Sequence, residues 1–247
     1  MTFDETIQSI KDDARWRENP YFVALRDGTF SRDDFVETQI QFYSAVVFFS
    51  RPMSVLAARL PHGHMRVNIL DNVHEEHGEG DLSGSHASTF QALLGRLGVS
   101  MEDVDRRAMW PAVRAFNTSL SGACLFDDTV TAVGVMGMIE DLFAEISGFI
   151  GRQIVSSGWL PADQIVHYAV HETLDEEHSR EFYDIVAPFW DQHARYRYHI
   201  TQGLRLGAYL FMSMYEGLYR DRGLRRDREV TGAHSMAADG FLPPDLL

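Results

Sequence analysis

The chain has few of the features that mark a secreted protein or a nucleic-acid-binding protein. Cys124 is its only cysteine, which excludes an intramolecular disulfide and fits a reducing, cytoplasmic environment. Lysine and arginine number 22 against 36 aspartate and glutamate, so the formal net charge is −14. This charge disfavours nonspecific binding to nucleic acid or to anionic lipid, and a small-molecule substrate is the better expectation.

Long uninterrupted apolar runs are also missing. The most hydrophobic stretch, residues 130–150, contains three acidic side chains, whereas a membrane-spanning helix needs about 20 predominantly apolar residues. Residues 1–13 carry more acid than base and no apolar run, so we expect no secretory signal peptide. The sequence therefore predicts neither a membrane span nor a secretory signal.

Alternating runs of β-branched residues, which would predict a β-sheet, are absent, whereas helix start and stop signals recur throughout the chain. We expect helices over residues 31–51, 65–78, 86–97, 100–117, 127–151, 161–187 and 191–222. Pro52 and Pro188 are expected to end or interrupt two of them. With 247 residues and 45% hydrophobic content, one large core is possible. The prediction is an all-α fold, a single bundle of about seven or eight helices over residues 1–222, followed by a polar tail over residues 223–247.

One segment combines metal-ligating residue types at helical spacing, namely His171, Asp175 and His178. Because a helix has 3.6 residues per turn, these side chains fall within roughly 60° of arc, over about 10 Å of axis. Imidazole and carboxylate groups bind iron, zinc or manganese, and the length of the stripe suits a pair of metal ions. The alternative is a solvated acidic helix face, because three glutamates lie among these residues. The triple spacing favours metal binding.

Three more candidate ligands lie upstream. Glu140 shares its helical stripe with apolar residues, where an acid is costly unless it binds a partner; pairing with an arginine is the alternative. Glu76 and His86 flank the glycine-rich residues 78–85. On a straight helix they would lie about 15 Å apart along the axis, but the glycines allow the chain to double back. A glutamate-rich helix end before a glycine loop is also an ordinary surface feature.

Together the candidates supply three carboxylates and three imidazoles. With two divalent irons, such a site would carry a net charge near +1 and keep coordination positions open for dioxygen and substrate. A pair of metals about 3.5 to 4 Å apart can share carboxylate bridges. The pattern therefore indicates oxidation chemistry with dioxygen.

The order of these residues resembles the heme-oxygenase-like di-iron oxidases, which share their helical architecture with the cofactorless pyrroloquinoline-quinone synthase and with thiaminase II. The match is strongest in residues 171–179, good in residues 76–86 and moderate at Glu140, and the resemblance spans residues 35–220. It implies two Fe(II) ions, dioxygen as co-substrate and a homodimer. It also implies that the iron ligands are Glu76, His86, Glu140, His171, Asp175 and His178. Members of that family perform N-oxygenation, desaturation with C–C cleavage, or oxidative decarboxylation of amino acids and fatty acids.

Two positions leave alternatives open. N-oxygenating members carry an additional carboxylate ligand, whereas residues 35–51 offer only Glu37, near the start of the helix, which weakens the N-oxygenase interpretation. Glu79, seven residues before His86, competes with Glu76. Cys124, a nucleophile in a thiaminase-like enzyme, is expected to be a buried structural residue.

The sequence thus predicts a cytoplasmic non-heme di-iron oxygenase or oxidase of a small amino-acid-like or fatty-acid-like substrate, with no nucleic-acid or membrane partner. A cofactorless oxidase, in which the same histidines hydrogen-bond the substrate, is an alternative. So is a non-catalytic metal-binding helical protein. A ferritin-like carboxylate site, suggested by Asp71 with His74 and by Asp175 with His178, ranks lower, because it leaves His86 and His171 without a role.

Overall fold

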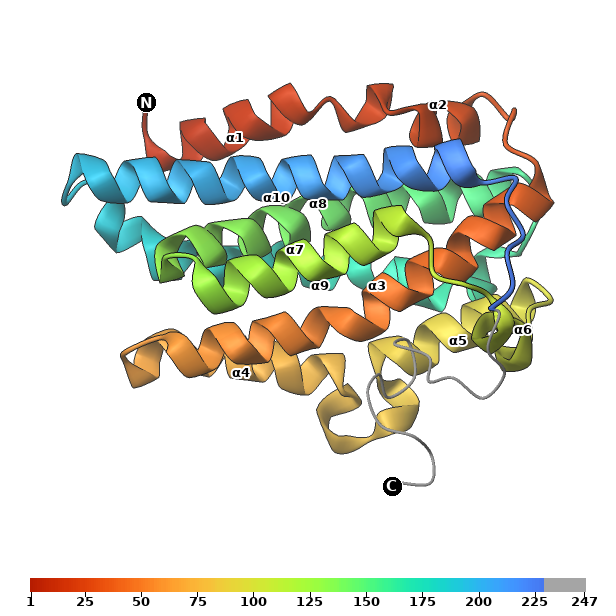
Figure 1. The fold of residues 1–247 in the computed structure, drawn as a ribbon, viewed down its shortest axis with the longest axis horizontal. Coiled ribbons are helices and arrows are strands. Elements are labelled where there is room, and N and C mark those ends of the chain that lie inside the picture. The colour runs from red at the N-terminus through yellow and green to blue at the C-terminus, as the bar shows by residue number, and fades with distance from the viewer. Residues whose placement is uncertain (229–247) are drawn as a thin grey trace.

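The computed structural model describes residues 1–228, and within residues 170–176 it describes the backbone alone. Its α-helices are α1 (Phe3–Ala14), α2 (Pro20–Arg26), α3 (Arg32–Arg59), α4 (Gly63–Glu76), α5 (His86–Arg96), α6 (Met101–Arg106), α7 (Pro111–Phe126), α8 (Thr129–Ser156), α9 (Val166–Trp190) and α10 (Ala194–Asp221) (Figure 1). Short 3-10 helices span Trp16–Glu18, Gly78–Gly80, Leu82–Gly84 and Ala162–Gln164. The only β-type pairing in the described residues is an isolated bridge between Arg107 and Asp227.

The all-α prediction is confirmed, but the expected helix number is wrong, because the described residues contain more helices than seven or eight. The helices α1 and α2 were not predicted from the sequence. α6 and α7 were predicted as one helix, but they are separate because Pro111 occupies the first turn of α7, after Trp110 in extended conformation.

Pro52 and Pro188 do not end their helices. α3 continues through Pro52 to Arg59, and α9 continues through Pro188 to Trp190. A proline inside a helix costs about 3 kcal/mol, because it removes one backbone hydrogen bond and crowds the preceding turn. Several side chains that follow Pro52 on α3, including Met53 and Leu56, are fully buried. Burial on both sides of the proline offsets the local cost, so the helix persists.

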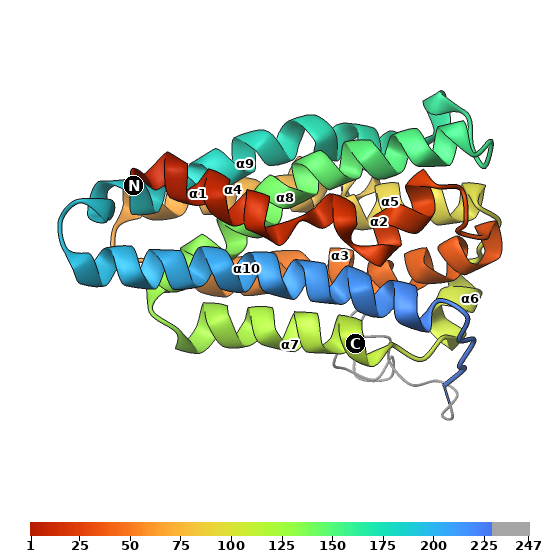
Figure 2. The same ribbon diagram turned by 90° about the horizontal axis from the view of Figure 1, so that it is seen from above.

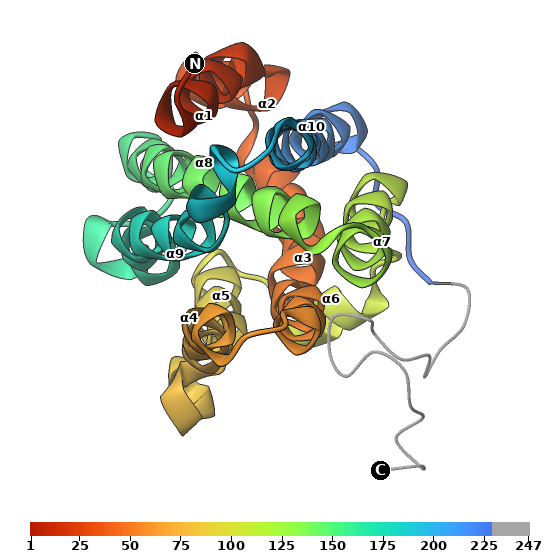
Figure 3. The same ribbon diagram turned by 90° about the vertical axis from the view of Figure 1, so that its left-hand side faces the viewer.

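α8 is the central helix of the bundle. Most of its side chains are buried, and it packs most extensively against α9 and α10, which lie beside it in the end-on view (Figure 3). α1 and α2 cover α8 and α10 from one side (Figure 2). On the other side, α4 and α5 each pack against both α3 and α9 (Figure 3). Side chains of α3, α4, α5 and α8 therefore face a common interior.

The chain returns to the α6–α7 connection after α10. The Ala108 N–H donates to the Arg226 carbonyl, and the Arg228 N–H donates to the Arg106 carbonyl, both at 2.9 Å. Residues 223–228 of the predicted polar tail are thus bound to the bundle, and the rest of the tail, residues 229–247, lies outside the described residues.

None of the helices within residues 1–228 has both the length and the apolar character that crossing a membrane requires.

Candidate metal centre

A cavity of about 40 Å³ lies among six helices and contains three of the six predicted ligands, Glu76, His86 and Glu140. The other side chains that line it are apolar: Phe42, Ala45, Val46, Phe49, Phe116, Ile139, Phe143 and Phe211. Glu76 comes from α4, His86 from α5 and Glu140 from α8. Glu76 and Glu140, which are 64 residues apart in the sequence, therefore line the same cavity.

Glu76 is the last residue of α4 and lies on its buried stripe, after Met65, Ile69 and Asn72. These positions recur at helical spacing, so the same face that packs on the bundle carries the Glu76 carboxylate inward. His86 is the first residue of α5, whose N-terminus is capped by the Ser85 hydroxyl accepting a hydrogen bond from the Ser88 N–H.

The glycine-rich segment reverses the chain between these two residues, as the sequence predicts. Gly78 has φ of +70°, and a Cβ there would lie 2.7 Å from the Ser85 nitrogen, so a side chain does not fit. The reversal places Glu76 Oε1 at 2.9 Å from His86 Nδ1. Glu79 is exposed within this turn, at φ of +54°, and it does not line the cavity. The geometry therefore favours Glu76 over Glu79.

Glu140 lies near the middle of α8 and is only 4% exposed. Two carboxylates and one imidazole thus face a cavity whose described lining includes no lysine or arginine. Carboxylates attract a cation more strongly in apolar surroundings than in water, and a metal ion is one such cation. The donor set is therefore suited to a cation, and its oxygen and nitrogen atoms suit iron.

His178 is buried, but it does not belong to the described lining of the cavity. Its Nε2 lies 2.8 Å from Glu75 Oε2, which joins α9 to α4 next to Glu76. The side chains of His171 and Asp175 lie outside the described residues. Among the side chains that are described, no three His, Cys, Asp or Glu residues are arranged to hold a metal ion. The roles of the six residues as ligands stay a prediction.

His167 is a buried histidine that the sequence analysis missed. It lies four residues before His171, so the stripe of metal-ligating residue types on α9 begins one turn earlier than recognised. Its Nδ1 lies 3.0 Å from the Thr89 hydroxyl of α5, and its ring meets the His86 ring edge-on at 6.3 Å between centroids.

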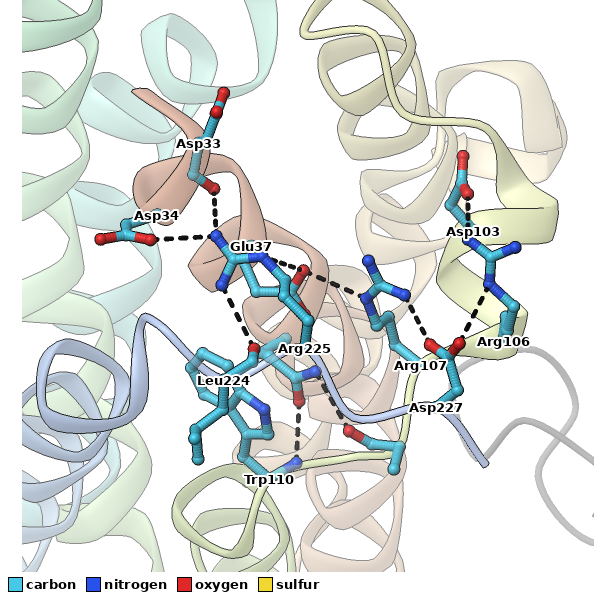
Figure 4. Close-up of polar contacts among 12 residues, drawn as sticks. Asp33, Asp34, Glu37, Asp103, Arg106, Arg107, Trp110, Leu224, Arg225 and Asp227 are labelled. Atoms are coloured by element: carbon cyan, nitrogen blue, oxygen red, sulfur yellow. Dashed lines mark hydrogen bonds and ion pairs between the residues drawn. The ribbon is translucent and has the colours of Figure 1, made fainter. Parts of the chain in front are cut away.

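Glu37 of α3, considered above as the additional carboxylate ligand of an N-oxygenase, forms ion pairs outside the cavity. It is 2% exposed, and Oε2 accepts from Arg107 at 3.1 Å and lies 3.4 Å from Arg225 (Figure 4). Arg107 also binds Asp227, so Glu37 fastens the segment after α10 to the bundle (Figure 4). Two arginine partners give Glu37 a structural role and leave it outside the cavity.

Cys124 is fully buried in α7, and burial raises the pKa of its thiol to about 12. A thiol with this pKa is protonated at neutral pH and is not a nucleophile. Cys124 is therefore a structural residue, as expected.

A group of carboxylates lies between α4 and α9. Burial, followed by the negative charges of Glu75, Glu177, Asp71 and Asp184, raises the pKa of Glu181 from 4.5 to about 7. The folded protein thus holds this proton more tightly than the unfolded chain, so the free energy of unfolding falls as pH rises from about 4.5 to about 7.

We expect Glu181→Gln to increase the free energy of unfolding at pH 8 and to reduce its fall between pH 5 and pH 8. Urea unfolding at both pH values, with a chelator present throughout, measures this. Glu216→Gln, at an exposed position of α10, is the matched control. An E181Q variant with the wild-type pH dependence would refute the assignment.

Solved structures share this fold. A domain of unknown function with a heme oxygenase-like fold from Shewanella denitrificans OS217 is 14% identical and has a TM-score of 0.72, over 88% of this chain and 90% of that chain. A TenA homologue from Pseudomonas syringae pv. tomato DC3000 is 15% identical and has a TM-score of 0.70, over 87% and 92% of the two chains. The protein therefore has a heme-oxygenase-like fold.

A sequence model described as iron-containing redox enzyme matches residues 36–212, which include all or part of each helix that lines the cavity and all six candidate ligands. The chain belongs to this family of iron-containing redox enzymes. It is similar to 4-aminobenzoate synthase from Nitrosomonas europaea, with 21% identity over 201 residues, 77% of this chain and 80% of that protein. The resemblance inferred from the motifs is thereby confirmed for family and fold.

Proposed function

We propose that the protein is a non-heme di-iron oxidase or oxygenase, which uses dioxygen to oxidise a small amino-acid-like or fatty-acid-like substrate. The observation that carries the proposal is the convergence of Glu76, His86 and Glu140 on one otherwise apolar cavity. Membership of an iron-containing redox family supports iron as the metal.

The proposed ligands are Glu76, His86, Glu140, His171, Asp175 and His178. Coordination of one metal by both Glu76 and His86 would replace the hydrogen bond between them. Likewise, His178 would exchange its contact with Glu75 for the metal. When bound, two ferrous ions would supply electrons for the reduction of dioxygen.

The cavity walls around the two carboxylates are mostly apolar. Five phenylalanines surround the carboxylates, and an apolar environment strengthens the attraction between an anionic ligand and a cation. A volume of about 40 Å³ admits on the order of three water-sized molecules. This favours a compact substrate over an extended acyl chain, and the relative named for the synthesis of 4-aminobenzoate is consistent with a small compound.

Two alternatives share the same fold. In a cofactorless oxidase, His86 and His178 would hydrogen-bond the substrate, and activity would survive chelators. A non-catalytic protein would bind metal without reacting with oxygen. A fold by itself does not specify a reaction, so chelator sensitivity and reactivity with oxygen separate these alternatives from the proposal. A cytoplasmic homodimer is part of our proposal.

The test is anaerobic loading with ferrous iron, with irons counted per chain, followed by rapid mixing with oxygen in the presence and absence of candidate amino acids and fatty acids. We expect two irons per chain and a transient visible absorption whose rate changes with the true substrate. His74→Ala is the matched control, because His74 is exposed on α4, and it should bind the same iron. A wild-type protein that takes up no iron would refute the proposal and favour the cofactorless oxidase. Loss of iron in H74A would favour the ferritin-like site.

A further inference from the structure

α5 depends on its neighbours for its position. It has 11 residues and follows the glycine-rich turn, and the hydroxyls of Ser85 and Ser88 in its first turn donate hydrogen bonds to the Leu82 carbonyl. Its polar contact with α9 joins the side chains of Thr89 and His167 at 3.0 Å. His167 is 1% exposed, and its ring packs edge-on against the ring of Phe90 of α5, with 4.7 Å between ring centroids.

The hydrogen-bond directions in this contact follow from the chemistry of the groups. The Thr89 hydroxyl donates to the His86 carbonyl at 3.0 Å, and a carbonyl can only accept. A hydroxyl has one hydrogen, so when Thr89 donates it to the His86 carbonyl, the contact with His167 requires the tautomer in which Nδ1 carries the proton and donates. A continuous chain therefore leads from the His167 ring through the Thr89 hydroxyl to the His86 backbone.

We infer that His167 is a positioning residue for His86, acting through Thr89; this inference rests on the proposed function, in which His86 binds iron. Through Thr89, His167 holds the first turn of α5 against α9, and its ring lies beside the His86 ring at an interplanar angle of 88°. Groups that orient a metal ligand without touching the metal typically contribute 10- to 100-fold to metal affinity.

Thr89→Val tests this inference, because valine keeps the shape of threonine and loses its hydroxyl. We expect T89V and His167→Leu each to weaken Co(II) binding about tenfold or more and to change the visible spectrum of bound Co(II). The T89V/H167L double variant should bind Co(II) as tightly as the single variant with the lower affinity, because both substitutions remove the same chain of hydrogen bonds. Thr89→Ser, which keeps the hydroxyl, should restore wild-type binding.

Thr131→Val is the matched control. Its hydroxyl donates to the His199 carbonyl between α8 and α10, so it also loses one buried interhelical hydrogen bond, but far from His86 in the fold. T131V should keep the wild-type Co(II) spectrum and affinity. Equal weakening by T131V and T89V would show a general loss of stability and overturn the inference.

Nitrogen-15 spectra of the histidine rings in the metal-free protein separate this inference from the proposed function. We expect His167 to carry its proton on Nδ1, and the His86 signals to shift in T89V but not in T131V. If the wild-type protein binds no metal, the proposed function fails. The spectra of the metal-free protein still test whether His167 positions His86 through Thr89. A proton on Nε2 of His167, or unchanged His86 signals in T89V, would overturn the inference.

Discussion

Glutamine in place of Glu140 is expected to weaken iron binding at least about 100-fold and to leave fewer than two irons per chain. Glutamine has nearly the shape of glutamate, but it is neutral and a much weaker iron ligand. A two-iron site with the three carboxylates of the wild type would carry a net charge near +1, whereas the two carboxylates left in E140Q would give a net charge near +2. Because Glu140 lies in an apolar cavity, water does not compensate the added positive charge. Oxidation activity should fall in parallel.

The measurement is the number of irons bound after anaerobic loading, together with the competition of a chelator for the bound iron. Glu145→Gln is the matched control, since it makes the same change five residues further along α8. Glu145 forms an ion pair with Lys11 at 2.9 Å on the outer side of the helix. E145Q should bind iron as the wild type does. Two tightly held irons in a folded E140Q protein would exclude Glu140 as a ligand.

The burial of Glu140 was predictable, because the local pattern of apolar residues around it was sufficient to indicate it. An acid on an otherwise apolar stripe of a long helix is buried wherever that helix packs, and α8 is the central helix. The neighbouring Asp141 shows the limit of this argument, because it binds Lys11 and Tyr183 and does not line the cavity. The register of the stripe, rather than the acidic residue type, separates the two.

The choice between Glu76 and Glu79 required the structure. Spacing from His86 admits both, because the glycines between them permit many chain paths. In the structure α4 continues to Glu76 in register with its buried face, whereas Glu79 occupies the exposed turn beyond Gly78, which favours Glu76. Which path a glycine-rich turn takes depends on contacts with Ser85, and sequence periodicity does not show such contacts.

The proline positions and His167 illustrate two other limits. Pro52 has the local signature of a helix end, yet burial of the residues around it keeps α3 intact. Tertiary packing overrides a local rule in this case. His167 belongs to the same stripe as His171, but its role depends on Thr89, which lies 78 residues away in the sequence. Partners on distant helices are not visible in the spacing of either segment.

Alanine in place of Gly203 is expected to lower the free energy of unfolding by about 3 kcal/mol or more. A Cβ at this position of α10 would lie 2.1 Å from the Thr131 carbonyl oxygen of α8 and 2.9 Å from its carbonyl carbon. Both are backbone atoms, so no side-chain rotation relieves the overlap, and the two helices must separate. For a chain of this length, the loss corresponds to a fall in Tm of roughly 6 to 12 °C, measured by thermal unfolding of the metal-free protein.

Gly122→Ala is the matched control for this substitution. Gly122 lies within α7, and a Cβ there would have no atom within 4 Å. Since alanine favours helix over glycine by up to about 1 kcal/mol, G122A should be neutral or slightly stabilising. Similar stability of the two variants would contradict the direct backbone contact between α8 and α10. If G203A also weakens iron binding, the separation of the helices reaches Glu140, because α8 carries both Thr131 and Glu140. The close α8–α10 contact would then be part of what holds the candidate site in shape.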